Sequence, residues 1–323
     1  MKRGCKLKEI IKKIINERNY LFFRSKIKEQ HLKIYLLRRR IKAQYLKIFF
    51  LNKKIKERYI KRQFKKNIGY EIDFTKEPKT FNEKIQFRKL YDNNPLYSIC
   101  SDKYRVREYV KERIGEEYLI PLLLVTDKLT EEQWDKLPNQ FVAKANHNSG
   151  PVQIVKDKSK ANKKKIIKEL NNQLKLDYGV LSLEKYYSDI PRKIIVEEFL
   201  EDNIKDYKFF CFNGEVKLMF VASDRQIETK FDFYDMDFKK LNIKQHYPNS
   251  NVIEKKPILF EKMKEISKIL SKDFSHVRID LYEVSGKIYF GEMTFCHFCG
   301  LEVFEPSEWD YIIGEYWEQE KLK

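Results

Sequence analysis

Cysteine is scarce in this chain, with five residues among 323, at positions 5, 100, 211, 296 and 299. An odd and small number does not fit the paired cysteines that staple small secreted domains, so we expect a reducing cytoplasm. Cys296 and Cys299 form the one close pair, but no second pair of ligands stands at a spacing suited to zinc. We interpret them as two loop cysteines.

Long apolar runs are missing from the N-terminal part of the chain. Its longest uninterrupted apolar runs, such as Ile48–Leu51, fall far short of the ~20 residues that cross a bilayer. Charged residues also interrupt every stretch that would form the core of a signal peptide. Proline and glycine are absent from residues 5–68, which predicts one long helix there.

Acidic residues are scarce in the same region. Residues 1–66 carry 24 Lys and Arg against four Glu, whereas the rest of the chain carries 42 basic and 44 acidic residues. The positive charge therefore belongs to one segment and not to the remaining body, which predicts two differently built parts.

The basic segment contains a 14-residue repeat in three copies, at residues 20–33, 34–47 and 48–61. Each copy starts with four apolar residues and places an Ile at its eighth position, so the apolar positions share one helix face. A self-associating coiled coil, a nucleic-acid-binding helix and a helix on an anionic membrane surface all fit this pattern. We favour the membrane surface, because the apolar residues are bulky and no nucleic-acid docking motif is present.

Beyond this segment the chain mixes helices with strands and hairpins, without a repeated βαβ pattern, which predicts an α+β fold. The predicted helices are 81–90, 102–114, where Ser101 or Asp102 would cap the start, 161–176, 257–271 and 306–317. The predicted strands are 118–125 at a sheet edge, 140–147, 152–155, 193–200, 207–212, 215–222, 231–238, 277–282 and 287–294.

The hairpin formed by the last two strands carries the most informative residues. Folding about Ser285-Gly286 sets Asp280 opposite Glu292, and strand alternation puts Arg278 on the same face. Two carboxylates and a guanidinium on one face need partners, which a divalent cation with bound phosphates would supply. An exposed face with an ordinary surface ion pair is the alternative.

A second motif joins the strands at 140–147 and 152–155. Lys144 lies on the first strand, and the small residues Asn148-Ser149-Gly150 form the loop between the two. Such a loop lets backbone amides approach phosphate oxygens, although a plain hairpin gives the same pattern.

The order of these motifs resembles the ATP-grasp superfamily, and more narrowly the teichuronopeptide-biosynthesis type found in cell-surface polysaccharide loci. The resemblance covers about residues 81–317 and leaves out the basic helix. It rests on FNEKIQFRKLYDNNPLY (81–97), DKYRVREYV (102–110), PNQFVAKANHNSG (138–150), DYKFFCFNGEVK (206–217), VRIDLY (277–282), GKIYFGEMTF (286–295) and FEPSEWDY (304–311).

This resemblance implies an ATP-grasp fold, with ATP between two α+β lobes, and it implies a role for each matching residue. Phosphate contacts would come from Lys103 and Lys144, with the flap Asn148, Ser149 and Gly150. The adenine hinge would be Glu198, Phe199 and Leu200, and Asp206 would lie near the ribose. Lys208 and Arg278 would be the catalytic cations, and Asp280, Glu292 and Thr294 would hold Mg²⁺. Asn148 and Pro151 stand where this type usually has glycine.

The predicted domains are the basic helix (1–66), an N-terminal subdomain (67–138), the small ATP-grasp lobe (139–203) and the large lobe with the metal site (204–323). The resemblance implies an ATP-dependent carboxylate–amine ligase that acts through an acylphosphate in cell-surface polysaccharide biosynthesis, on the inner face of the membrane. His147 is a candidate proton acceptor for the amine or a structural histidine. A glycosyltransferase using Asp235-Met236-Asp237 and a non-catalytic membrane-tethered ATP-binding protein are the alternatives.

Overall fold

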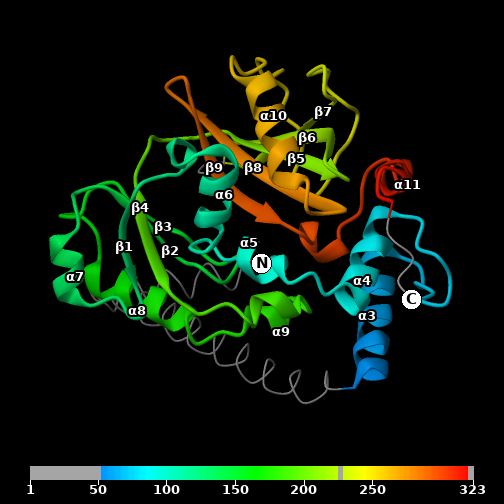
Figure 1. Ribbon diagram of the computed structural model, residues 1–323, viewed down its shortest axis with the longest axis horizontal. Coiled ribbons are helices and arrows are strands. Elements are labelled where there is room, and N and C mark those ends of the chain that lie inside the picture. Colours follow the sequence, from blue (N-terminus) through cyan, green and yellow to red (C-terminus); the bar gives the residue numbers. More distant parts are fainter. Residues whose placement is uncertain (1–51, 225–227, 319–323) are drawn as a thin grey trace, which may run out of the picture.

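The computed structural model describes residues 52–224 and 228–318, which contain two antiparallel β-sheets (Figure 1). The smaller sheet has the strand order β1 (Leu122–Thr126), β4 (Ile194–Glu198), β2 (Phe141–Ala145) and β3 (Gln153–Val155). The larger sheet has the order β7 (Lys230–Tyr234), β6 (Glu215–Ser223), β5 (Asp206–Phe212), β8 (His276–Val284) and β9 (Lys287–Thr294). The predicted α+β class is confirmed.

Helices cover both sheets. The α-helices are α3 (Lys53–Ile68), α4 (Phe81–Tyr91), α5 (Leu96–Cys100), α6 (Val106–Ile114), α7 (Glu131–Lys136), α8 (Lys163–Gln173), α9 (Tyr178–Ser182), α10 (Phe260–Ser271) and α11 (Glu308–Glu315). Three 3₁₀ turns complete them: η1 (Glu116–Tyr118), η2 (Lys185–Tyr187) and η3 (His297–Gly300). In Figure 1, α7 and α8 accompany the small sheet, and α10 lies over the large one.

The two predicted hairpins of the large sheet are confirmed. Asn213 and Gly214 turn β5 into β6 with φ of 49° and 79°, and Ser285 and Gly286 turn β8 into β9 with φ of 51° and 75°. Two successive positive φ values match the right-handed twist of the flanking strands, which explains these turn residues. The register pairs Asp280 with Glu292, as expected from the sequence.

The core of the large lobe lies on both faces of its sheet. One face packs Phe209, Met219 and Ile279 with residues of α10 and α6, and the other packs Phe210 and Phe220 with residues of α4 and α11. Burial on both faces explains why β5 is apolar almost throughout. The exceptions in β5, Asp206 and Lys208, are also buried and therefore need charged partners.

The described end of the basic segment is helical, as predicted, and it belongs to the body. Helix α3 begins after the Asn52 cap and ends at Gly69, which has a φ of 100°. Its residues Ile60 and Phe64 are buried in one cluster with Phe87 of α4. The boundary predicted at residue 66 therefore falls inside a packed helix. The rest of the repeat, residues 1–51, lies outside the described residues.

Several element boundaries differ from the expectations. Helix α6 starts at Val106, not at Asp102, and neither Ser101 nor Asp102 caps it. Instead, the Asp102 carboxylate accepts a hydrogen bond of 2.8 Å from Asn146, which explains why it is not part of the helix. The edge position of β1 is confirmed, but residues 116–118 form a 3₁₀ turn before it.

The short helices were missed, because only local signals predict them. Helix α7 begins with a capping box, in which the side chains of Thr130 and Gln133 accept hydrogen bonds from each other's backbone amides. A threonine followed three residues later by glutamine is a signal for this motif. None of the described helices, over residues 52–224 and 228–318, is long and apolar enough to cross a membrane.

Candidate active site

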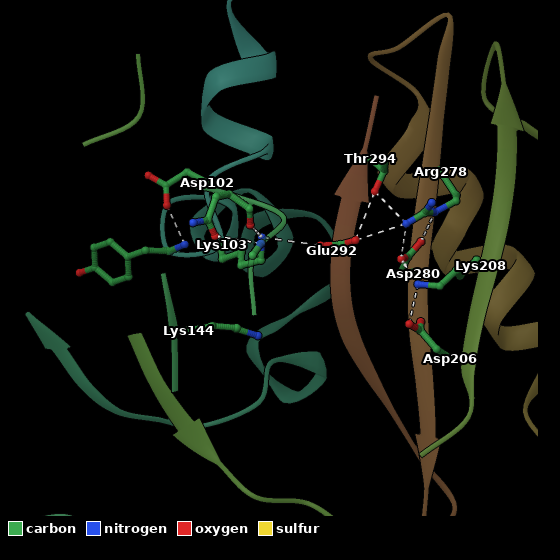
Figure 2. Close-up of polar contacts among 12 residues, drawn as sticks. Asp102, Lys103, Lys144, Asp206, Lys208, Arg278, Asp280, Glu292 and Thr294 are labelled. Carbon is green, nitrogen blue, oxygen red and sulfur yellow. Dashed lines mark hydrogen bonds and ion pairs between the residues drawn. The ribbon is translucent and has the colours of Figure 1, made fainter. Parts of the chain in front are cut away.

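The charged side chains of the large sheet gather on one face because of its register. Lys208 of β5 pairs with Asp280 of β8, and Asp280 pairs with Glu292 of β9. Residues two positions along a strand point the same way, so further members join this row. We call it the large-sheet cluster: Asp206, Lys208, Arg278, Asp280, Glu292 and Thr294 (Figure 2).

Arg278 is the centre of this cluster. Its guanidinium donates two hydrogen bonds of 2.7 Å to the two carboxylate oxygens of Asp280, and others to Thr294 (3.0 Å) and Glu292 (3.3 Å). A further bond of 2.8 Å goes to Nδ1 of the buried His297. All three guanidinium nitrogens donate, and Nη1 keeps one N–H beyond its bond to His297. The neighbouring carboxylates raise the pKa of Arg278 in spite of its burial.

Lys208 neutralises the other carboxylates of the row. Its ammonium lies 2.5 Å from Asp206 and also forms a short ion pair with Asp280. Only 2% of Asp206 and 0% of Asp280 is exposed, so both carboxylates depend on these cations in place of water.

Glu292 is the most exposed carboxylate of the large-sheet cluster, with 38% of its side chain exposed. Burial of the group raises its pKa, but Lys103, Lys208 and Arg278 outweigh this effect and lower the pKa to about 2. The carboxylate is therefore ionised at any physiological pH, as a metal ligand must be.

Two cations face this cluster from the small-sheet side. Lys103, in the loop before α6, donates a hydrogen bond of 2.8 Å to the carbonyl of Asn148 and lies 3.7 Å from Glu292. Burial lowers the pKa of Lys103. Lys144 on β2 points toward the same space (Figure 2) and pairs with Glu197 of β4 at 2.6 Å. The candidate site thus lies between the two sheets.

The loop between β2 and β3 is held by its own side chains. The Asn148 carboxamide accepts a hydrogen bond of 3.1 Å from the Gly150 amide and donates one of 3.3 Å to Gln173 of α8. Gln173 also donates to the carbonyl of Pro151 at 3.1 Å. Ser149 at the tip is exposed. The Asn148 side chain and the backbone carbonyl of Pro151 therefore tie the loop to α8, and only the first of these contacts depends on a departure from glycine.

The predicted hinge residues are less closely joined to the site. Glu198, Phe199 and Leu200 lie at the end of β4, and the Glu198 side chain is exposed. Within residues 52–224 and 228–318, no hydrogen bond or ion pair connects these three side chains to the large-sheet cluster. The backbone of Glu198 donates to the carbonyl of Pro121 on the chain leading into β1.

Sequence reasoning missed the side chains that support the charged ones. Glu197, adjacent to the predicted Glu198, is the carboxylate that meets Lys144. His297 receives a hydrogen bond from Arg278 and bonds Gln245 through its other nitrogen at 2.8 Å, which fixes the Nε2–H tautomer. Asn146 joins the carboxylate of Asp102 to the chain at Pro191 and Lys193. His297 stands in the Cys-His-Phe-Cys segment, which was the available signal.

The structural interpretation of His147 fits the structure. Its Nε2 lies 3.1 Å from the carbonyl of Leu176, so Nε2 carries the proton, and the ring is fully buried. Burial lowers the pKa of His147 to about 4.

The Asp235-Met236-Asp237 segment forms a turn, in which the Asp235 carboxylate accepts hydrogen bonds from the amides of Asp237 and Lys239.

The predicted metal ligands have the chemistry that Mg²⁺ takes. Glu292 offers exposed carboxylate oxygens and Thr294 a hydroxyl, whereas both oxygens of the buried Asp280 are already bonded by Arg278 and Lys208. Mg²⁺ is commonly held by one or two carboxylates together with waters and substrate phosphates. Across the described part of the chain, no three or more His, Cys, Asp and Glu side chains gather as a metal cluster by themselves. The residues therefore fit a metal that arrives with phosphates.

Comparison with protein families gives one decisive match. The model of the TupA-like ATP-grasp family matches residues 83–318. The chain belongs to this family. The match leaves out the repeat segment and covers both sheets, so the ATP-grasp fold predicted from the motifs is confirmed. No curated protein matches the chain.

Solved structures similar to this family member are ATP-grasp enzymes. D-alanine–D-alanine ligase from Bacillus anthracis, complexed with ATP, is 16% identical with a TM-score of 0.34, over 61% of this chain and 53% of that one. The same enzyme from Helicobacter pylori is 15% identical with a TM-score of 0.35, over 66% and 61%. The ATP-grasp ligase PsnB, with minimal precursor, Mg and ADP, is 11% identical with a TM-score of 0.36, over 63% and 52%. The chain spans little more than half the length of these neighbours, and such low TM-scores transfer no substrate.

Proposed function

We propose that the chain is an ATP-dependent carboxylate–amine ligase. The observation that carries this proposal is the meeting of Lys103, Lys208 and Arg278 with the carboxylates Asp280 and Glu292, while Lys144 points toward the same space. Four cations directed to one space between the sheets suit a triphosphate, and the two carboxylates suit the metal that accompanies it.

Each side chain has a role that its contacts support. Asp280, Glu292 and Thr294 would hold Mg²⁺, which neutralises charge on the transferring phosphoryl group when bound. Arg278 is locked by Asp280 and His297, so it stabilises developing charge without having to reorganise. Lys103 and Lys144 would bind phosphates, with Asn148, Ser149 and Gly150 above them.

The chemistry proceeds in two transfers. A substrate carboxylate attacks the γ-phosphorus of ATP, and the bond to the β-phosphate oxygen breaks to release ADP and an acylphosphate. An amine then attacks the acyl carbon, phosphate leaves, and the amine loses a proton as the amide forms. The buried His147, whose pKa lies near 4, bonds a backbone carbonyl and does not take that proton.

The proposed setting is cell-surface polysaccharide biosynthesis at the inner face of the membrane. The family match supports the ATP-grasp chemistry, and the basic repeat supports a position at an anionic surface.

Removal of residues 1–51 tests the membrane role. It should abolish liposome binding and leave nucleotide affinity unchanged. Unchanged liposome binding would contradict the membrane role. The deletion stops before α3 because Ile60 and Phe64 of that helix belong to the core.

Calorimetric titration of Mg-ATP into the full chain tests the site. Binding should require Mg²⁺, and Glu292→Gln should weaken it at least about tenfold, because a metal carboxylate typically contributes more than ~1.4 kcal/mol. Glu308→Gln, an exposed carboxylate on α11, is the matched control. Binding that is insensitive to Glu292→Gln would contradict the proposed site.

The same samples separate ligation from binding alone. Formation of ADP that depends on both a carboxylate and an amine, tested with sugar acids and amino acids, supports the ligase. Retained Mg-ATP binding with no ADP formed under any substrate pair would instead favour the non-catalytic ATP-binding protein.

A further inference from the structure

A second charged cavity lies outside the large-sheet cluster. It has a volume of about 290 Å³ and is lined by the end of α4, by α5, by η2 and by Lys56 of α3. None of its lining residues belongs to the large-sheet cluster or to the phosphate-binding residues proposed above. This cavity is therefore not explained by nucleotide binding.

Its basic residues divide into two kinds. Arg88 has a carboxylate partner: its guanidinium lies 3.4 Å from Asp92, and it donates to the carbonyls of His276 and Phe295 at 2.8 and 2.9 Å. Lys56, Lys89 and Lys185 are different: no carboxylate of residues 52–224 and 228–318 lies within ion-pair distance of any of them. Three lysines thus converge without a paired negative charge.

Among the described residues, Lys56 and Lys89 donate only to backbone carbonyls. Lys56 donates to the carbonyl of Lys89 at 2.6 Å, and the buried Lys89 donates to the carbonyl of Cys299 at 2.7 Å. An ammonium has three donors, so each retains donor capacity for a ligand. Burial, and to a smaller extent the positive charges of Lys89 and Lys185, lower the pKa of Lys56 to about 8.

The acidic residues of the cavity do not cancel this charge. Asp92 is bonded by Tyr97 and Arg88, and Asp189 is exposed. Glu184 is buried and bonded by Tyr186 and by Cys299; burial raises its pKa, and the charge of Lys89 opposes this rise. The described lining thus carries four basic and three acidic side chains, a net charge of one positive unit, and none of these carboxylates lies within ion-pair distance of a lysine.

We propose that this cavity binds a small anion bearing a phosphate or carboxylate group, held by Lys56, Lys89 and Lys185. A buried cation without a counter-charge is costly, and an anionic ligand would remove that cost. The volume lies at the lower end of small-molecule sites and admits a group of sugar-phosphate size. The proposal goes beyond the proposed function and does not rest on it.

The cavity also adjoins the candidate active site through one segment. The carbonyl that Lys89 bonds belongs to Cys299 in η3, and the chain runs from there back to Thr294 at the end of β9. An anion bound by Lys89 would therefore be connected through this hydrogen bond to the segment that follows the predicted metal ligands.

Calorimetry of the full chain with inorganic phosphate, glucose 1-phosphate and glucuronate tests the proposal. We expect at least one probe to bind, and Lys56→Met and Lys185→Met to weaken it at least tenfold. Lys185 is exposed, so its substitution leaves the fold intact. Lys54→Met, an exposed lysine of the same helix, removes the same charge and should change nothing. The tightest of the three probes identifies the source of the anionic group.

A second readout distinguishes this cavity from the nucleotide site. The pKa of Lys56, followed by NMR of labelled lysine, should rise on addition of the bound probe, and Lys144→Met should leave probe affinity unchanged. Absence of binding by all three probes would overturn the proposal. So would binding that Lys144→Met removes and Lys56→Met does not. Neither result bears on Mg-ATP binding, which Glu292→Gln tests separately.

Discussion

The two walls of the candidate ATP site are built in different ways. On the large sheet, Arg278 and Lys208 are buried and bonded to several carboxylates, with Asp280 shared between them. On the small-sheet side, Lys144 has one ion pair with Glu197, and Lys103 holds a backbone carbonyl. The large wall is therefore arranged before any ligand arrives, whereas in the proposed site the lysines of the small wall would exchange partners to reach phosphates.

The largest predicted effect breaks the large wall. Arg278→Met should lower the free energy of unfolding by about 3–5 kcal/mol, because Asp280 would remain buried with only Lys208 beside it. Urea denaturation followed by circular dichroism measures the loss. Arg278→Lys keeps the charge but not the five-donor fork, so it should restore part of the stability. A loss below about 1 kcal/mol in Arg278→Met would show that the wall is not pre-arranged.

The two walls also differ in how far the sequence predicted them. Alternation along two strands and one Ser-Gly turn were sufficient to bring Arg278, Asp280 and Glu292 together, since a hairpin register is local. The partner of Lys144 was not predicted. Glu197 and Glu198 are adjacent and point to opposite faces of the sheet, and the sequence alone does not determine which of them shares a face with Lys144. Gln245 lies 52 residues from His297, so their bond depends on the tertiary fold alone.

The second prediction concerns acid stability, where a buried histidine of the small lobe titrates. The pKa of His147 falls from an ordinary 6.5 to about 4 on folding. Between these two pH values the imidazole is therefore protonated in the unfolded chain and neutral in the folded chain. Stability is therefore complete above pH 6.5 and lost as the pH falls toward 4, by about 3 kcal/mol from this group.

His147→Gln tests this contribution, because the amide can still donate to the carbonyl of Leu176 but does not titrate. Urea midpoints of the wild type should fall more steeply than those of the variant between pH 6.5 and 4. Burial also lowers the pKa values of His276 and His297, so the urea midpoints of both the wild type and the variant should still fall with decreasing pH. Parallel curves would mean that His147 accepts a proton in the folded state.

The third prediction removes a cation from the small wall. Lys144→Met should weaken Mg-ATP binding about tenfold, since a charged hydrogen bond to phosphate contributes about 1.5–3 kcal/mol. The loss of unfolding free energy should be smaller than in Arg278→Met, because Arg107 remains 3.9 Å from Glu197. Lys217→Met, an exposed lysine on β6, is the control for charge alone. Equal affinity in Lys144→Met and Lys217→Met would remove Lys144 from the site.

The smallest predicted effect distinguishes the structure-based partner from the sequence-based one. Glu197→Gln should tighten Mg-ATP binding about two- to threefold, because Lys144 no longer has to leave a carboxylate, and desolvation offsets most of the Coulombic gain of a buried ion pair. Glu198→Gln changes the exposed neighbour on the opposite face of β4. If Glu198→Gln weakens binding while Glu197→Gln has no effect, the side chain at the hinge contacts the nucleotide as the family resemblance implies, and Lys144 does not exchange partners. If only Glu197→Gln acts, ligand binding and the Lys144–Glu197 pair compete, and the small wall stores its phosphate-binding cation in an ion pair until the nucleotide arrives.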